Sequence, residues 1–494
     1  MKKGSITPFC AISLTLVASL LFVLLEASRV YGLDRYATLR AEAGIDSVCA
    51  EYQPFLWQQY GLLFLDGAYG TEQFSTGYVS ERLENHLKEN CDTTDWLEEW
   101  LGLDLFALTV DNLLLEGYAL ATDDEGELFL NYVAEREKEN LPLGVAEDLC
   151  AMYQQADAME EKYGGIEDSI AKAQRVLSEV KEAWFMEKEA ERETPDTTIL
   201  EEALSNARQM QNGGTLKMIF EDASSISQKI SKLPSDLQAR VKEEGTMHIA
   251  TNKDWYRKIL VLIYMEEYFA NYTDPKAGHF LDYEMEYVIC GKETEWENLA
   301  GALERLMLIR EAANVAYLIQ DQEKMALAEG LAELVGLMAG ENPGVVKVIQ
   351  AGIIGAWAYM ESVLDVRTLV SGGLIPLVKA DGEWTTELTN LFAVFDETAK
   401  AKACAEGLNY VDYLKQILFM TGNQKLAYRM MEVMEMGMQS QELYRNCRMD
   451  HMVVALRYKV QFESRPVFCE LVTIGEIYRG NYFFLKEVER SYIP

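Results

Sequence analysis

The strongest hydrophobic pattern of the chain lies in its first 32 residues. Lys2 and Lys3 precede an uninterrupted apolar run from about Pro8 to Leu25. A run of roughly 18 such residues reaches the length at which a helix crosses the hydrocarbon core of a bilayer. Basic residues stay on the cytoplasmic side of such a helix. We therefore predict a single-pass cell-membrane protein with a cytoplasmic N-terminus, an anchor over 1–32 with its transmembrane helix at about 8–26, and an extracytoplasmic remainder.

The pattern after the anchor predicts an α+β fold that is mainly α-helical. The helix is expected to continue as a stalk toward Pro54, because no strong helix breaker precedes that residue. Apolar residues at 103–110 and 113–121 predict two strands joined by a turn at Asp111-Asn112. Strict alternation over 456–463 predicts another strand. We expect these N-terminal and C-terminal strands to pair in one small sheet of an extracytoplasmic head.

Helices are predicted for most of the central part of the chain. Thr294 and Glu297 have the spacing of a capping box, in which each side chain satisfies a backbone amide of the other residue. Asn342-Pro343 is a second strong helix start. The apolar segment between Lys347 and Glu361 is too short to cross a membrane, so it predicts a buried central helix.

Two charged helices are expected between residues 146 and 193, coiled against each other and broken at Gly164-Gly165. The Pro-, Gly- and Ser-containing stretch 194–233 predicts a linker, and a further helix is expected at 386–400. The predicted organisation is a membrane anchor (1–32), a stalk helix with an N-terminal α/β part (33–140), a charged helical pair with a mobile linker (141–233), a helical core (234–445) and C-terminal strands (446–494).

The composition excludes some partners and leaves others open. The chain has 494 residues, 49% of them hydrophobic, which predicts a folded protein of two or three domains. Its formal net charge of -35 would repel nucleic acid at long range, so nucleic acid is excluded as a partner. The acidity fits a solvated surface, cations or a basic protein partner.

No recognisable catalytic chemistry stands out in the sequence. The four histidines are far apart, the eight cysteines lack ligand spacing, and the chain has no P-loop, GxSxG or HExxH motif. We therefore predict that the protein is not an enzyme and assign no catalytic residue, metal or cofactor.

Four charged residues of the central part are predicted to form structural ion pairs. Glu361 and Asp365 lie near the C-terminal end of the predicted central helix, where carboxylates oppose the helix dipole and need partners. Arg367 and Arg310 are the cations that could provide them. A cation site is the functional alternative, but no loop carries the ligand spacing of a calcium site.

The end of the apolar run holds a further pair, Glu26 and Arg29, for which two roles stay open. A carboxylate near lipid is costly, and an i, i+3 pair with Arg29 would satisfy it locally. Alternatively, Glu26 pairs with a basic residue of another subunit and sets the register of helix packing in an assembly.

Two cleavage sites compete with an uncleaved anchor. A pilin-type leader peptidase would cut between Gly4 and Ser5 and leave the hydrophobic helix in place. An ordinary signal peptidase would cut after Gly32, where Val30-Tyr31-Gly32 is a poor match to the small-residue rule.

Several blocks of the sequence resemble known families. An uncharacterised domain family of unknown function from Gram-positive anaerobic bacteria is similar over nearly the whole chain, most clearly at Leu281–Lys292, Glu297–Glu311, Ala356–Arg367 and Leu408–Leu414. The amino terminus also resembles the TadE/TadG-like pseudopilins of tight-adherence pilus systems, at Gly4–Arg29, Asp46–Val48 and Trp57–Leu62. The first family has no assigned activity, so the resemblance implies a topology and a pilus or secretion context without catalytic residues.

These observations lead to three functional hypotheses in a fixed order. The first is a pseudopilin-like structural or assembly component of a surface pilus or secretion system, held in the lipid bilayer through residues 8–26 and in contact with protein partners of that assembly. The second is a membrane-anchored surface binding or scaffold protein unrelated to pili. An extracytoplasmic enzyme of unknown type comes third.

Overall fold

The computed structural model describes residues 6–91, 104–186, 194–233, 236–396, 398–402, 404–469 and 480–494. The chain divides into two compact units, each built from segments that are distant in the sequence. The first unit comprises 1–136, 240–251 and 438–494, and the second comprises 137–239 and 252–437. Both ends of the chain therefore belong to the first unit.

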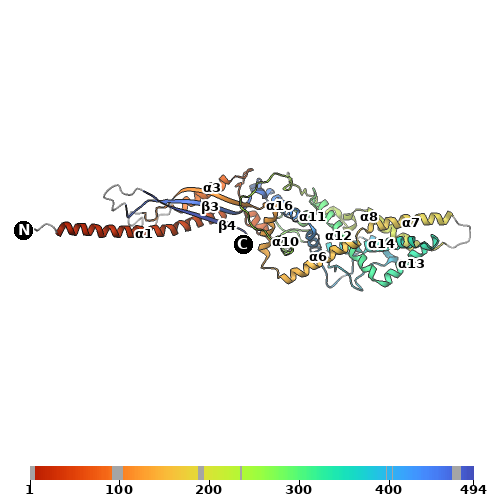
Figure 1. Ribbon diagram of the computed structural model, residues 1–494. Helices are drawn as coiled ribbons and strands as arrows, with labels where there is room; N and C mark the ends of the chain where they lie inside the picture. Colours follow the sequence, from red (N-terminus) through yellow and green to blue (C-terminus); the bar gives the residue numbers. More distant parts are fainter. Residues whose placement is uncertain are drawn as a thin grey trace, which may run out of the picture. The chain divides into compact units, whose positions relative to one another are not determined.

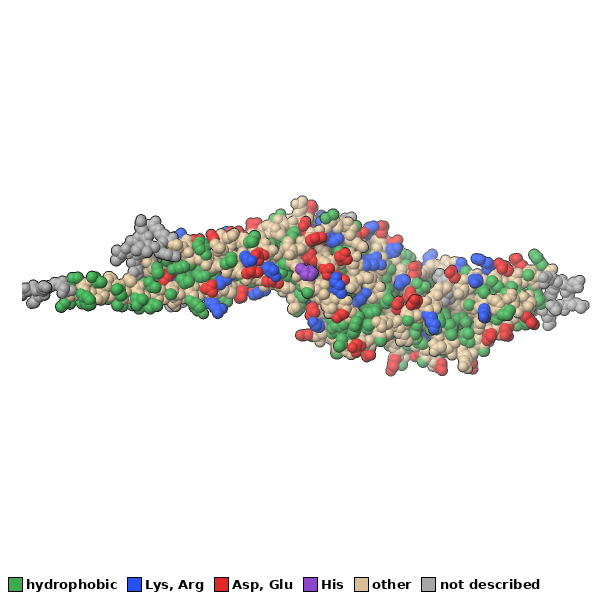
Figure 2. Space-filling view, in the orientation of Figure 1, with side chains coloured by type: hydrophobic (Ala, Val, Ile, Leu, Met, Phe, Trp, Pro, Cys, Tyr) green, Lys and Arg blue, Asp and Glu red, His purple; other side chains and the backbone are tan. Residues whose placement is uncertain are grey.

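The first unit is built along a 44-residue helix, α1 (Ile6–Cys49), drawn in red in Figure 1. Within the described residues, α1 alone is long and apolar enough to cross a membrane; its best 18-residue window has a mean hydropathy of 2.4 and is not buried. Hydrophobic side chains gather at this N-terminal end of α1 in Figure 2. The C-terminal half instead carries a buried stripe, at Glu26, Arg29, Leu33, Ala37, Ala41, Gly44, Ile45 and Val48.

Small residues let other elements approach the stripe of α1 closely. Its buried positions recur every three or four residues, so they share one face of the helix. A Cβ atom on Gly44 would lie 2.5 Å from Cδ2 of Leu87 in α3 (Thr76–Cys91). The Tyr458 hydroxyl donates to the carbonyl of Ala41 at 2.5 Å. The second half of α1 is thus a core helix of the unit.

A four-stranded antiparallel sheet packs against α1 and α3 (Figure 1). Its strands are β1 (Leu65–Asp66), β2 (Thr109–Leu120), β3 (Met452–Ser464) and β4 (Tyr482–Ser491). β3 pairs with each of the other three, so the prediction that N-terminal and C-terminal strands share one sheet is confirmed. The buried face of β3 contributes Leu456, Tyr458, Val460 and Phe462 to the core.

The predicted turn at Asp111-Asn112 is wrong, because β2 is one continuous strand. Its pairing register with β3 shifts between Val110 and Asn112, which marks a β-bulge. A bulge accommodates an extra residue and leaves the ladder intact on both sides, so polar residues inside an apolar run do not require a turn. The other helices of this unit are α2 (Pro54–Tyr60) and α5 (Glu127–Glu137).

Helix α14 (Pro343–Val370) is the centre of the second unit, and nearly all its residues from Ile353 to Leu369 are buried. It packs against α7 (Ile166–Met186), α8 (Thr198–Asn212), α12 (Glu295–Gln320) and α13 (Gln322–Met338). The remaining helices are α6 (Leu143–Tyr163), α9 (Thr215–Ile219), α10 (Trp255–Tyr268), α11 (Glu284–Cys290), α15 (Tyr410–Met420) and α16 (Asn423–Gln439).

Both predicted helix starts of this unit are confirmed. Thr294 and Glu297 form a complete capping box at the start of α12. The Asn342 side chain accepts from the Gly344 amide at 2.9 Å, and Pro343 occupies the first turn of α14. The predicted buried central helix is therefore α14.

Three segments of this unit differ from the sequence pattern. The prediction that the two charged helices coil together is wrong: α6 packs against α12 and α10, and α7 packs against α14 and α8. The stretch 194–233 contains α8, whose apolar residues at helical spacing form a buried face. The expected helix at 386–400 is a kinked 3-10 segment over Leu388–Phe395.

Candidate functional site

A buried ion pair marks the point where the apolar run of α1 ends. Nη1 of Arg29 lies 2.9 Å from Oε1 of Glu26, and the two side chains are 4% and 3% exposed. The i, i+3 spacing places both on the same face of the helix. The charge of a carboxylate at the end of the candidate membrane segment is therefore balanced one turn away.

The other oxygen of Glu26 holds the turn that follows β3. The backbone N–H groups of Val467, Phe468 and Cys469 donate to Oε2 at 3.1, 2.6 and 3.3 Å. Successive amides that converge on one oxygen form an anion-binding concavity. Glu26 thus connects the end of the apolar helix to residues that follow it by more than 440 positions.

Arg29 connects the same point of α1 to the ends of two strands. Its Nε donates to the carbonyl of Leu105 at 2.7 Å, just before β2. Its Nη1 and Nη2 donate to the Arg465 carbonyl at 3.0 Å and to Oγ of Ser464 at 2.8 Å. We call these residues the anchor cluster: Glu26, Arg29, Leu105, Ser464, Arg465 and Val467–Cys469.

The anchor cluster bears on the two roles left open for Glu26. Both of its carboxylate oxygens are occupied by groups of its own chain, which favours a local role over pairing with another subunit. Sequence spacing could indicate Arg29 as the partner, whereas backbone amides carry no residue-type signal. The expected processing site, Gly4 and Ser5, lies outside the described residues.

The second unit contains a buried charge cluster between α12, α14 and the segment after α14. Arg310 lies 3.0 Å from Asp365, Lys379 lies 2.6 Å from the other oxygen of Asp365, and Lys379 also pairs with Glu361. All four side chains are 0% exposed. Two cations and two carboxylates therefore balance each other away from water.

Backbone groups complete the buried charge cluster. Glu361 accepts from the amides of Thr385 and Thr386 at 3.0 and 2.8 Å. Burial alone would raise the pKa of Asp365, but Arg310 and Lys379 outweigh burial and hold the pKa below its ordinary value. The arrangement stabilises the packing of α12 on α14 and leaves Asp365 charged.

Arg367 does not join this cluster. Its guanidinium donates to the carbonyls of Met218, Val394 and Asp396 at 2.7 to 2.9 Å. Lys379 takes the place next to Glu361 and Asp365 instead. Sequence reasoning missed Lys379 because it lies in an irregular segment, where residue spacing gives no indication of which side chains meet.

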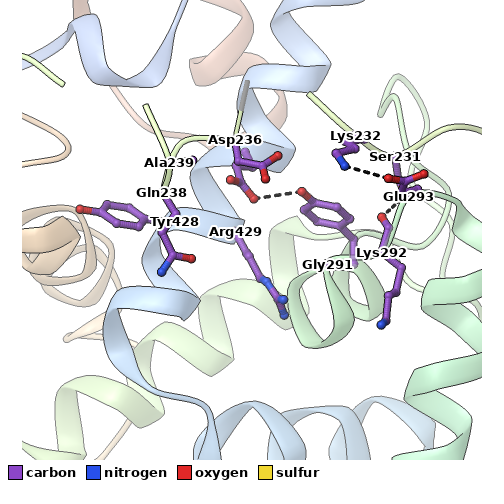
Figure 3. Close-up of a pocket in the computed structure, with 12 residues that line it drawn as sticks. Ser231, Lys232, Asp236, Gln238, Ala239, Gly291, Lys292, Glu293, Tyr428 and Arg429 are labelled. Atoms are coloured by element: carbon purple, nitrogen blue, oxygen red, sulfur yellow. Dashed lines mark hydrogen bonds and ion pairs between the residues drawn. The ribbon is translucent and has the colours of Figure 1, made fainter. Parts of the chain in front are cut away.

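A polar cavity of about 250 Å³ lies in the second unit, beside the C-terminal end of α11 (Figure 3). Arg429 of α16 donates to the carbonyls of Val288, Ile289 and Cys290 at 3.0, 2.6 and 2.8 Å and so caps α11. Gly291 has φ +63°, and a Cβ there would lie 2.4 Å from the guanidinium. The basic residue therefore serves the helix end.

The acidic side of the same cavity is also occupied by internal contacts. Glu432 accepts from the Tyr287 hydroxyl at 2.9 Å and from the Leu237 amide at 3.0 Å. Burial raises the pKa of Glu432. At the rim, Lys232 and Glu293 form an ion pair at 2.8 Å. The cavity could hold a small polar molecule, but its charged side chains show no nucleophile and base directed at a common point.

An apolar groove of about 470 Å³ lies between α13 and α14. Leu337, which is 54% exposed, lies in it together with Val346. Glu329 and Glu333 lie along the same groove. A surface of this kind suits a protein partner that presents apolar and basic side chains.

Within the described residues, no group of three or more His, Cys, Asp or Glu side chains could hold a metal ion. All eight cysteines are free. Neither curated proteins nor solved structures gave a match to this chain. Residues 193–464, more than half of the chain, match a family of unknown function, DUF5702, and the chain therefore belongs to that family.

Proposed function

We propose that this protein is a membrane-anchored, extracytoplasmic structural or assembly component of a surface pilus or secretion system. The observation that carries the proposal is the continuity of α1, whose first half is bare and apolar and whose second half is buried under the sheet and α3. A single rigid helix of this kind joins a membrane segment to a folded head without a flexible linker. This is the construction expected of pilin-like subunits.

Two further observations support the proposed location and role. Lys2 and Lys3 precede the apolar run, which by the positive-inside rule directs the bulk of the chain outward. The resemblance of the amino terminus to TadE/TadG-like pseudopilins, and of the rest to a family of Gram-positive anaerobes, agrees with a pilus or secretion context. In this proposal, the protein acts by packing against partners, and its acidic groove between α13 and α14 faces a basic one.

Amino-terminal sequencing of the protein from native membranes provides the first test. A mature chain that begins at Ser5 and stays in the membrane fraction supports a pilin-type leader. A chain that begins at Leu33 would lose the apolar half of α1 together with Glu26, and this result would refute the proposal.

Crosslinking of the tagged protein in native membranes provides the second test. Recovery of pilus subunits or of the secretion ATPase is the expected result, with Leu337→Glu as the variant that weakens it and Leu327→Glu, also exposed on α13, as its matched control. Recovery of neither would favour the alternative, a membrane-anchored binding protein whose candidate site is the polar cavity beside α11.

A further inference from the structure

The anchor cluster places an aromatic side chain of the head beside the apolar run of α1. The rings of Phe22 and Phe468 are stacked, with 6.4 Å between their centroids and 26° between their planes. Phe22 precedes Glu26 by one helical turn, so it lies inside the apolar run and not beyond it. Phe468 therefore reaches a level of α1 that precedes the first charged residue of the helix.

The length of the apolar run determines how much of α1 a bilayer must cover. Residues Pro8 to Leu25 span about 27 Å at 1.5 Å per residue, slightly less than the roughly 30 Å of a hydrocarbon core. A bilayer that covers the whole run has no excess length to spare, so its outer boundary must lie close to Glu26. Phe22 is then inside this boundary, and the ring stacked on it is at the same depth.

The turn cannot easily withdraw from this position. The amides of Val467, Phe468 and Cys469 are the donors to Oε2 of Glu26. Lifting the turn would strand a carboxylate oxygen near lipid, and an unsatisfied charged group there is costly. With Arg29 in place, the pair is neutral and saturated, so it is compatible with the edge of the hydrocarbon region.

The surrounding side chains have the distribution of a membrane interface. Phe468 is half-buried, and Arg465, three residues before it, is exposed. Tyr31, 72% exposed, lies just over one turn beyond Glu26 on α1. Aromatic residues are enriched at the level of lipid headgroups, and arginine extends its charged end toward them. Apolar, aromatic and basic side chains thus follow one another in the order of increasing distance from the bilayer centre.

We propose that the turn Val467–Cys469 enters the outer interface of the lipid bilayer, where Phe468 inserts between lipid chains beside Phe22. The head is then attached to the membrane at two points, by α1 and by this turn. The inference rests on the proposed membrane anchoring of α1, but it adds a lipid contact that no membrane-spanning segment requires.

Photocrosslinking to lipid tests this contact in the full chain. Benzoylphenylalanine replaces Phe468 in protein reconstituted into phosphatidylcholine vesicles, and lipid adducts are measured by mass spectrometry after irradiation. Leu16, which is 67% exposed in the apolar run, is the positive control position. Trp57, which is 44% exposed on α2 beyond the other end of α1, is the aromatic negative control.

We expect adducts at position 468 within about threefold of those at position 16, and background labelling at position 57. Background labelling at position 468 with strong labelling at position 16 would overturn the inference and leave the anchor intact. Background labelling at both would overturn the anchoring as well. Val467→benzoylphenylalanine repeats the test with the Phe22–Phe468 stacking preserved, so a misfolded position-468 variant cannot decide the outcome.

Discussion

The anchor cluster of the first unit and the buried charge cluster of the second solve the same problem with different partners. In both, a buried glutamate accepts backbone amides from an irregular segment: Val467–Cys469 for Glu26, and Thr385 and Thr386 for Glu361. Around Asp365, however, two cations share the carboxylates, whereas Glu26 has one arginine and three amides. The difference teaches that the second unit depends on balanced charge and the anchor cluster on hydrogen-bond geometry.

The largest effect is expected for Asp365→Asn, because it leaves Arg310 and Lys379 buried with one carboxylate between them. Breaking a buried ion pair from one side costs about 3–5 kcal/mol. Chemical denaturation followed by tryptophan fluorescence measures this loss, since Trp384 lies 5.5 Å from the Lys379 ammonium. The exposed groove residue Glu329, changed to Gln, is the control and should stay within about 0.5 kcal/mol of the wild type. A similarly small loss for Asp365→Asn would contradict the charge-balance interpretation.

Glu286 sharpens the comparison as a buried carboxylate to which, in the described part of the chain, no cation is paired. It accepts from the Tyr272 amide at 3.0 Å and the Tyr410 hydroxyl at 2.9 Å. Burial raises its pKa to about 7, above an ordinary value of 4.5. The folded state thus holds its proton more tightly than the unfolded state, so the stability this group contributes is complete below pH 4.5 and is lost as the pH rises through about 7.

We expect this loss to amount to about 3 kcal/mol between pH 4.5 and 8, from the conversion of 1.36 kcal/mol per pKa unit. Glu286→Gln should remove that part of the pH dependence and make the variant more stable than wild type at pH 8. Denaturation curves at several pH values measure it, with Glu323→Gln, in an exposed first-turn position of α13, as the control. An unchanged pH profile in Glu286→Gln would show that the carboxylate does not titrate in this range.

Arg29→Met should have a smaller and more local effect. The change leaves Glu26 without its cation and frees two carbonyls and one hydroxyl, at a cost of about 2 kcal/mol. Hydrogen exchange at the amides of Val467–Cys469 should accelerate by roughly 30-fold, which corresponds to that free energy. Exchange in α14, which belongs to the other unit, serves as the internal reference. Equal acceleration in both regions would mean that the anchor cluster is not a local structure.

The smallest effect is expected on the surface of the same unit, at the Lys88–Glu84 pair of α3. The two side chains are 57% and 45% exposed, and such pairs contribute about 0–1 kcal/mol. Lys88→Gln should therefore leave the denaturation midpoint nearly unchanged. A loss comparable to that of Arg29→Met would show that exposure is a poor guide to the energy of ion pairs in this chain.

The fold was more predictable than the clusters because periodicity is local and contacts between charged residues are not. Alternation at 456–463 and the cap at Thr294 each specify their element within a few residues. The bulge in β2 escaped prediction because Asp111-Asn112 has the composition of a turn, and only pairing with β3 keeps the strand extended. Lys379 and the three amides bound by Glu26 meet their partners only after distant segments pack.

The position of β3 has a consequence for biosynthesis. β3 completes the sheet that covers α1, yet roughly 400 residues separate the end of α1 from the start of β3. At 5–20 residues per second, translation of that interval takes on the order of 20–80 s. During this time, α1 is already made while its stripe of Leu33, Ala37 and Ile45 has no cover. The nascent chain therefore needs a temporary companion for this helix, and a truncation near the C-terminus would damage the part of the protein made first.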